Sequence, residues 1–344
     1  MLRKRTLPWL IFVVSALFML LGWYVTRPDL DGVELDGVPE EPIDEPAPEE
    51  PTTIKVAALL VFSPVLSHGQ EVELRLVGEP QVFAPGVISL PESNDEYLSL
   101  SPNGEHAVFT RREGRTTHLW ESRLTDAGWI EPELVSFSGD FNDNRGTFSP
   151  DGSQLFFASD RPSTVGTDPS QSLEIWVVDR TAVGWGKPRR LGPAVNGDQH
   201  DTHPAVARSG NLYFVRWGDT ETDIYVAEWT GDGYAEARPI GHGINTEGPE
   251  SHPYVDPDER FLIFTPTDRE GDYGGGDIYV SYRTESGWTA GANLGPPVST
   301  EWYEYSAKVT PDGRLMFSRA GFGEPEQRPA DLYVVDLEIR STGR

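Results

Sequence analysis

A repeated pattern of short strands and tight turns constrains the fold of this chain more than any other feature. The turns read SPNG (101–104), SPDG (149–152), ARSG (207–210), DPDE (256–259) and TPDG (310–313). Their second residues are 48, 58, 49 and 54 positions apart. A period near 50 residues built from strands is typical of the blades of a β-propeller. We therefore predict an all-β fold.

Each repeat contains the sequence signals of four strands. A short strand leads into the turn, where Asn-Gly or Asp-Gly favours the positive φ angles of a tight hairpin. An apolar strand follows, as in QLFFASDR (154–161), and then an alternating strand such as DIYV (223–226 and 277–280). The fourth strand begins at a Trp or Tyr, as in GWGKPRRLG (184–192). Each repeat is therefore predicted to be one four-stranded blade.

The ends of the repeat region predict how the ring closes. The fifth repeat stops after its third strand, whereas VGEPQVFAPGVIS (77–89) has the pattern of an unattached fourth strand. An N-terminal strand that completes the last blade would remove exposed edges, which gives five blades. Residues 54–75 are left open, either as part of a sixth blade or along the side of the disc. We predict a propeller over 54–344, with repeats starting near 95, 143, 201, 250 and 304.

Several motifs carry a family resemblance. SPDGSQLFFASDR (149–161), GGGDIYV (274–280) and the spaced W…LG…VN pattern resemble the WD40-like repeat of TolB-type propellers of the bacterial cell envelope. The resemblance covers roughly residues 77–337 and implies a propeller in the envelope. TolB-type proteins carry an additional N-terminal α/β domain, for which this chain has no matching sequence. Their role in a complex is therefore not implied here.

The N-terminal region has the composition of a membrane anchor and a tether. A basic start precedes an apolar run from Leu7 to Val25, long enough to cross a bilayer as a helix. This run ends with the bulky Trp23 and Tyr24, where a signal peptidase needs small residues. Residues 1–27 therefore favour a signal anchor over a cleaved signal peptide. Residues 28–53 are rich in Pro and acids and predict a disordered linker. The prediction is a single-pass inner-membrane protein with its propeller in the periplasm or outside the cell.

Composition excludes several functions. The net charge of −27 excludes nucleic acid as a partner, since phosphate binding requires clustered Lys and Arg. The chain has no cysteine, hence no disulfide, no thiolate nucleophile and no cysteine zinc site. The sequences G-x-S-x-G and H-E-x-x-H are also absent.

Equivalent positions on the innermost strands supply candidate ligand-binding residues. The position seven residues before the second residue of each turn is always acidic: Asp95, Asp143, Asp201, Glu250 and Glu304. The residues two positions further are Tyr97, Arg145, His203, His252 and Ser306. Because alternate residues of a strand share a face, both sets are predicted to ring the mouth of the channel. The alternative is that the acids are structural, accepting backbone N–H bonds or bridging blades.

Histidines within this ring suggest a metal site. His203 and His252, with Asp201 or Glu250 and also His200, would suit Zn²⁺ or Mn²⁺, whereas the carboxylates alone would suit Ca²⁺. DFNDNRG (140–146) resembles a calcium loop but has Arg145 where an EF-hand requires Gly, and GDYGGGD (271–277) occurs once. Both of these segments favour plain loops.

Two functions follow from the sequence. The first is a binding module for an envelope protein or a cell-wall component. The alternative is a carbohydrate hydrolase or lyase, with or without a divalent cation, whose site lies at the channel mouth.

Overall fold

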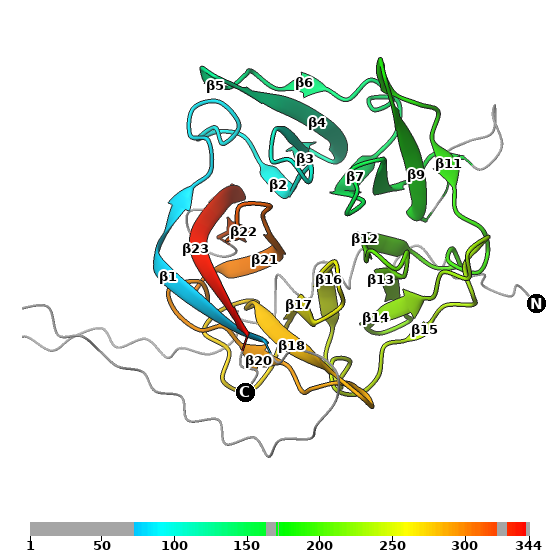
Figure 1. Cartoon of the computed structure of the whole chain (residues 1–344), viewed down its shortest axis with the longest axis vertical. Helices are drawn as coiled ribbons and strands as arrows, with labels where there is room; N and C mark the ends of the chain where they lie inside the picture. Colours follow the sequence, from blue (N-terminus) through cyan, green and yellow to red (C-terminus); the bar gives the residue numbers. More distant parts are fainter. Residues whose placement is uncertain (1–71, 163–169, 171, 322–328, 342–344) are drawn as a thin grey trace, which may run out of the picture. The chain divides into compact units, whose positions relative to one another are not determined.

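A computed structural model describes residues 72–162, 170, 172–321 and 329–341. In this part of the chain five antiparallel sheets surround a common axis (Figure 1). The prediction of a five-bladed, all-β propeller is confirmed. Among the described residues there is no helix of the length and apolarity needed to span a membrane. The predicted anchor and linker lie outside the described residues.

The blades follow the chain in order. Blade 1 contains β2 (Asp95–Leu100), β3 (His106–Glu113), β4 (Thr116–Thr125), β5 (Gly128–Trp129) and β6 (Glu133–Leu134). Blade 2 contains β7 (Asp143–Phe148), β8 (Gln154–Ser159), β9 (Glu174–Thr181), β10 (Gly184–Trp185) and β11 (Arg189–Arg190). Blade 3 contains β12 (Asp201–Val206), β13 (Leu212–Trp217), β14 (Thr222–Ala227) and β15 (Arg238–Pro239).

The last two blades have the same plan. Blade 4 contains β16 (Glu250–Val255), β17 (Phe261–Pro266), β18 (Tyr279–Thr284), β19 (Gly287–Trp288) and β20 (Ala292–Asn293). Blade 5 contains β21 (Tyr303–Val309), β22 (Arg314–Ala320), β23 (Asp331–Ser341) and β1 (Val72–Val82). In blades 1, 2 and 4 the fourth strand is split into two short pieces, both paired with the third strand.

The hydrophobic core lies between neighbouring blades. The second strand of each blade contributes a large, fully buried aromatic side chain: Phe109, Phe157, Phe214, Phe264 and Phe317. Each buried cluster combines residues of two adjacent sheets, as when Phe264 of blade 4 packs with Tyr213 of blade 3. Burying an aromatic side chain of this size contributes about 2–3 kcal/mol. The apolar second strands of the repeats therefore hold the blades face to face.

The ring is closed by β1, whose bounds differ from those predicted. β1 pairs with β23 from Val72 opposite Ser341 to Val82 opposite Tyr333, with a bulge between Val77 and Gln81. Closure by an N-terminal strand is confirmed, but the predicted segment 77–89 coincides with the strand only over 77–82. The chain turns after Val82, with positive φ at Ala84 and Gly86, because the apolar residues that follow pack between blades 5 and 1. Residues 72–75 belong to the closing strand, and 54–71 lie outside the described residues.

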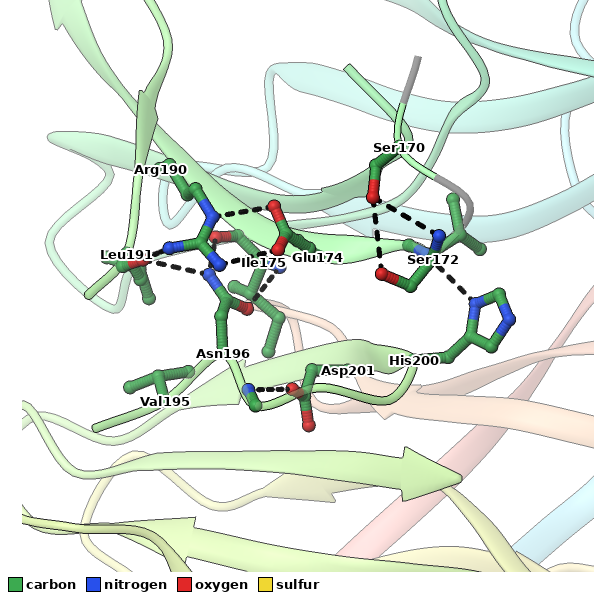
Figure 2. Close-up of polar contacts among 12 residues, drawn as sticks. Ser170, Ser172, Glu174, Ile175, Arg190, Leu191, Val195, Asn196, His200 and Asp201 are labelled. Carbon is green, nitrogen blue, oxygen red and sulfur yellow. Dashed lines mark hydrogen bonds and ion pairs between the residues drawn. The ribbon is translucent and has the colours of Figure 1, made fainter. Parts of the chain in front are cut away.

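An asparagine in the loop between two blades fixes the start of the third strand. Asn196 Oδ1 accepts from Ile175 N at 2.7 Å and its Nδ2 donates to Ile175 O at 2.9 Å (Figure 2). Asn245 forms the same two bonds with Ile224 in the next blade, at 3.1 and 2.9 Å. Asn196 is the asparagine of the VN pattern, and Asn245 follows Ile244 at the equivalent position. Each asparagine satisfies a backbone N–H of the third strand, and the carbonyl of the same strand residue also accepts from Leu191 N or Ile240 N.

Candidate functional site

The five acids predicted for the channel mouth are buried in ion pairs inside their own blades. Their exposure is 1% for Asp95 and 0% for the other four. Their arginine partners come from the second strand or the residues just after it. The pairs are Asp95–Arg111 (2.7 Å), Asp143–Arg161 (2.6 Å), Asp201–Arg216 (2.8 Å), Glu250–Arg269 (2.9 Å) and Glu304–Arg319 (2.7 Å). The prediction of a free acidic ring is therefore wrong, and the structural alternative describes these residues.

Each of these arginines also binds the loop that precedes its blade. Arg216 Nη2 donates to Val195 O at 2.6 Å, and Arg269 Nη2 donates to Ile244 O at 2.8 Å. The equivalent acceptors in the other blades are Ile88, Phe137, and Pro297 with Val298. Arg216 lies 4.8 Å from the centre of the Tyr225 ring, and the other four also lie over aromatic rings. Each acid–arginine pair thus joins a blade to the preceding loop.

Burial raises the pKa of the carboxyls of Asp95, Asp143, Asp201 and Glu304, and the hydrogen bonds and charge of the arginine partners act in the opposite direction. Both oxygens of Asp201 are occupied, one by Arg216 and the other by Arg216 and Gly197 N at 2.7 Å. The Asp201 carboxylate is thus held by Arg216 and the preceding loop.

A bulge in every innermost strand explains why the two predicted sets separate. Tyr97, Arg145, His203, His252 and Ser306 all have left-handed backbone angles, with φ between 54° and 58°. The pairing register of each strand shifts at this point. The alternation of side chains that applies to a regular strand is broken there. The acid therefore turns into the blade, whereas the residue two positions later reaches the axis.

A non-glycine residue in the left-handed region costs roughly 1–2 kcal/mol. We therefore expect Ser306→Ala to be less stable than Ser306→Gly by about 1 kcal/mol, although glycine normally weakens a strand. Ala307→Gly is the matched control at the next residue, whose φ is not positive, and it should lower stability. Urea denaturation of the three variants measures the difference. An alanine variant as stable as the glycine variant would show that the bulge is not strained.

The side chains at these bulges form a compact axial cluster. The rings of His203 and His252 are 4.3 Å apart between centroids, and the Tyr97 ring lies 5.6 and 5.7 Å from them. The Arg145 guanidinium lies 4.9 Å from the centre of the Tyr97 ring. Four blades thus bring Tyr97, Arg145, His203 and His252 together.

Hydrogen bonds define the charge state of this cluster. Arg145 Nε donates to His203 Nε2 at 2.7 Å, so that nitrogen carries no proton and His203 Nδ1 donates to Thr202 Oγ1 at 2.8 Å. Burial and the charge of Arg145 lower the pKa of both His203 and His252 well below its usual value. Both histidines are therefore neutral at pH 7.

A lysine that the sequence analysis did not single out completes the cluster. Lys308 of β21 is buried, and its Nζ reaches across to blade 2, donating to Gly146 O at 3.2 Å and Thr147 Oγ1 at 2.9 Å. Burial lowers its pKa to about 7. Lys308 lies two residues after Ser306, and counting two more residues along each strand would have found it. With Arg145 and Lys308 the axis carries positive charge, the reverse of the acidic site expected.

His200 lies apart from this network. Its Nδ1 accepts a hydrogen bond from Leu173 N at 2.9 Å (Figure 2), and its ring packs beside Trp217 at 5.3 Å between centroids. No group of three or more His, Asp or Glu side chains within the described ranges is arranged to hold a metal ion. The predicted metal ligands are therefore not assembled as a ligand shell. Arginines hold the two acids, Leu173 N holds His200, and Arg145 and Thr202 hold His203. The predicted set was His203, His252, His200, Asp201 and Glu250.

The DFNDNRG segment (140–146), predicted as a plain loop, is loop only over 140–142 and continues into β7 of blade 2. Asn142 donates from its backbone N and its Nδ2 to the carboxylate of Asp160, at 2.9 and 2.7 Å, and accepts from Thr117 N at 3.2 Å. Asn144 bonds Thr117 Oγ1 at 3.0 Å and Arg145. The amide oxygens that a calcium loop would direct at an ion are used within the protein: that of Asn142 accepts from blade 1, and that of Asn144 accepts from Arg145 Nη1.

Neither a family model nor a curated protein matches this chain. Solved structures similar to it include a putative TolB from Agrobacterium tumefaciens (19% identity, 72% of this chain and 80% of that one, TM-score 0.48). TolB from Acinetobacter baumannii is 13% identical over 72% of this chain and 56% of its own, with a TM-score of 0.42. The α-L-arabinofuranosidase PaAbf62A from Podospora anserina is 11% identical over 76% and 97%, with a TM-score of 0.48. The chain is a five-bladed propeller, the fold that the TolB-type resemblance of its repeats implies.

Proposed function

We propose that this protein is a membrane-tethered, extracytoplasmic propeller that binds another envelope protein or a cell-wall component. Residues 1–27 have the composition of an inner-membrane anchor and residues 28–53 that of an extended acidic tether. The tether would let a rigid disc reach a partner at some distance from the membrane. The resemblance to TolB-type repeats supports an envelope location.

The observation that carries this proposal is the pairing of all five ring acids with arginines. Glycoside hydrolysis generally requires two carboxyl groups that face the substrate, one as acid and one as base or nucleophile. Here the carboxyls of the inner strands are buried and paired. Glu96 is also paired, with Arg112 at 2.9 Å. The axis therefore favours recognition over hydrolysis.

The recognition surface in this proposal is the face on which the inner strands begin. Trp217 ends β13 on this face and is 43% exposed, and Tyr273, in the loop after β17, is 54% exposed. Exposed aromatic side chains are enriched among residues that dominate protein interfaces. Val183, in the β9–β10 turn on the opposite face, is 97% exposed and serves as a matched control position.

Photo-crosslinking in cells tests the proposal. The full chain would carry p-benzoylphenylalanine in place of Trp217 or, as the control, of Val183. We expect discrete adducts with envelope material from position 217 and none from position 183. Purified protein would also be incubated with a panel of cell-wall and plant glycans. Turnover of a glycan without any adduct at position 217 would contradict the proposed binding function and support the enzymatic alternative.

A further inference from the structure

Two cations at the propeller axis, Lys308 and Arg145, have no carboxylate partner among the residues that the structure describes. In the described part of the chain, every other Arg or Lys that is not exposed forms an ion pair with Asp or Glu. Lys308 is only 8% exposed, and its two hydrogen bonds to blade 2 leave one N–H of the ammonium unused. Arg145 uses Nε and Nη1 for His203 and Asn144, which leaves further N–H donors. Buried charges are normally paired, because removing them from water is costly.

Both cations line one cavity at the centre of the ring. Its walls are the axial cluster and its neighbours on the inner strands: Tyr97, Arg145, Thr147, His203, Pro204, His252, Pro253, Ser306, Ala307 and Lys308. No carboxylate is among them. The space open to the centre of a water-sized sphere is about 10 Å³, which is close to the room that one water needs.

We propose that this axial cavity binds a small monovalent anion, a halide or one oxygen of a carboxylate group, between the Lys308 ammonium and the Arg145 guanidinium. Such an anion would supply the missing counter-charge and accept the unused N–H donors. The size of the cavity excludes bulky oxyanions, and its positive charge excludes the divalent cation expected from the sequence. This site depends on the axial geometry alone and is independent of which partner the exposed face binds.

The groups facing Lys308 determine how binding depends on pH. They are Arg145, His203, His252 and Tyr97. Burial lowers the pKa of both histidines and raises that of Tyr97, so all three stay neutral between pH 6.5 and pH 9. Lys308, with a pKa of about 7 when no anion is bound, is the group that changes charge in this range. Anion affinity should therefore fall as the pH rises from 6.5 to 9.

Thermal unfolding of the purified full chain tests the site. MES, a bulky sulfonate, would be replaced stepwise by chloride or by formate at constant ionic strength. Above the dissociation constant we expect the Tm to rise by about 3 °C for each tenfold increase in anion. The rise should be larger at pH 6.5 than at pH 9. A response to chloride alone assigns a halide site, and a response to formate assigns a site for a carboxylate group.

Variants separate an anion site from a structural lysine. Lys308→Met should raise the Tm in MES, since it removes an unpaired buried charge, and should abolish the response to both anions. Lys187→Met, at an exposed lysine, should keep the wild-type response. A wild-type Tm that ignores both anions, or a response that Lys308→Met retains, would overturn the proposal. If Lys308→Met does not fold, an equal response of the wild type at the two pH values overturns the role of Lys308.

Discussion

Deletion of residues 72–82 is expected to open the ring and to lower the free energy of unfolding by 5 kcal/mol or more. β1 provides the whole fourth strand of blade 5, and without it one edge of β23 is unpaired. Val72 is buried, and Leu74 and Leu76 pack against the core shared by blades 4 and 5. Burial of an aliphatic side chain contributes about 1.5–3 kcal/mol, and the lost strand pairing adds to this. Urea denaturation followed by tryptophan fluorescence measures the effect.

Two controls make this result specific to ring closure. Arg75→Ser removes an exposed ion pair with Glu338 and leaves the strand in place, so its effect should stay below about 1 kcal/mol. A synthetic peptide of residues 72–82, added to the deleted protein, should restore part of the lost stability. A deletion no more harmful than Arg75→Ser would mean that the other four blades hold the ring without closure.

Asp143→Ala is expected to cost about 3–5 kcal/mol, because it leaves the Arg161 charge buried without its partner. Asp143 is fully buried, and Arg161 Nη2 donates to its two oxygens at 2.6 and 2.7 Å. Arg161 also donates to Phe137 O in the preceding loop at 3.3 Å. The variant should therefore weaken the contact between blades 1 and 2 as well as blade 2 itself.

The double variant Asp143→Ala with Arg161→Met should recover much of this loss, because it removes the unpaired charge and keeps an apolar side chain against the aromatic rings. Asp179→Ala, which breaks the exposed pair with Arg189, is the matched control and should cost less than about 1 kcal/mol. Equal effects of Asp143→Ala and Asp179→Ala would show that the buried pairs do not hold the blades together. Alanine substitution of each of the other four ring acids should likewise cost more stability than Asp179→Ala.

Much of the fold could be predicted from the sequence because its signals are local. The turns with Gly104, Gly152 and Gly313 recur at a period that only a propeller explains, and each of these glycines has the positive φ angle the turn requires. The missing fourth strand of the last repeat predicted closure by the N-terminal region. Its exact bounds depended on which apolar residues pack between blades 5 and 1, and this packing is a tertiary contact.

The arginine partners were present in the sequence but unrecognised. HAVFTR (106–111) and QLFFASDR (154–161) end with the arginine that binds the ring acid of the same blade, and in RLMFSRA (314–320) that arginine is the second-last residue. In three blades the two residues are direct cross-strand neighbours: Asp95 opposite Arg111, Asp201 opposite Arg216 and Glu304 opposite Arg319. Pairing the first and second strands around each turn would have predicted a salt bridge in place of a free acid.

By itself the sequence determined the repeated four-stranded blade, its strand order and closure by an N-terminal strand, because strands and turns have local signals that recur in every repeat. The choice between five and six blades was left to the structure. Only the tertiary structure decided which side chains face the axis and with what charge. The left-handed bulge at Arg145, His203 and their equivalents reverses the alternation that a regular strand would have. Lys308 reaches a neighbour on another blade, a contact that no local pattern encodes. A site expected to be acidic and metal-binding is for these reasons a cationic cavity.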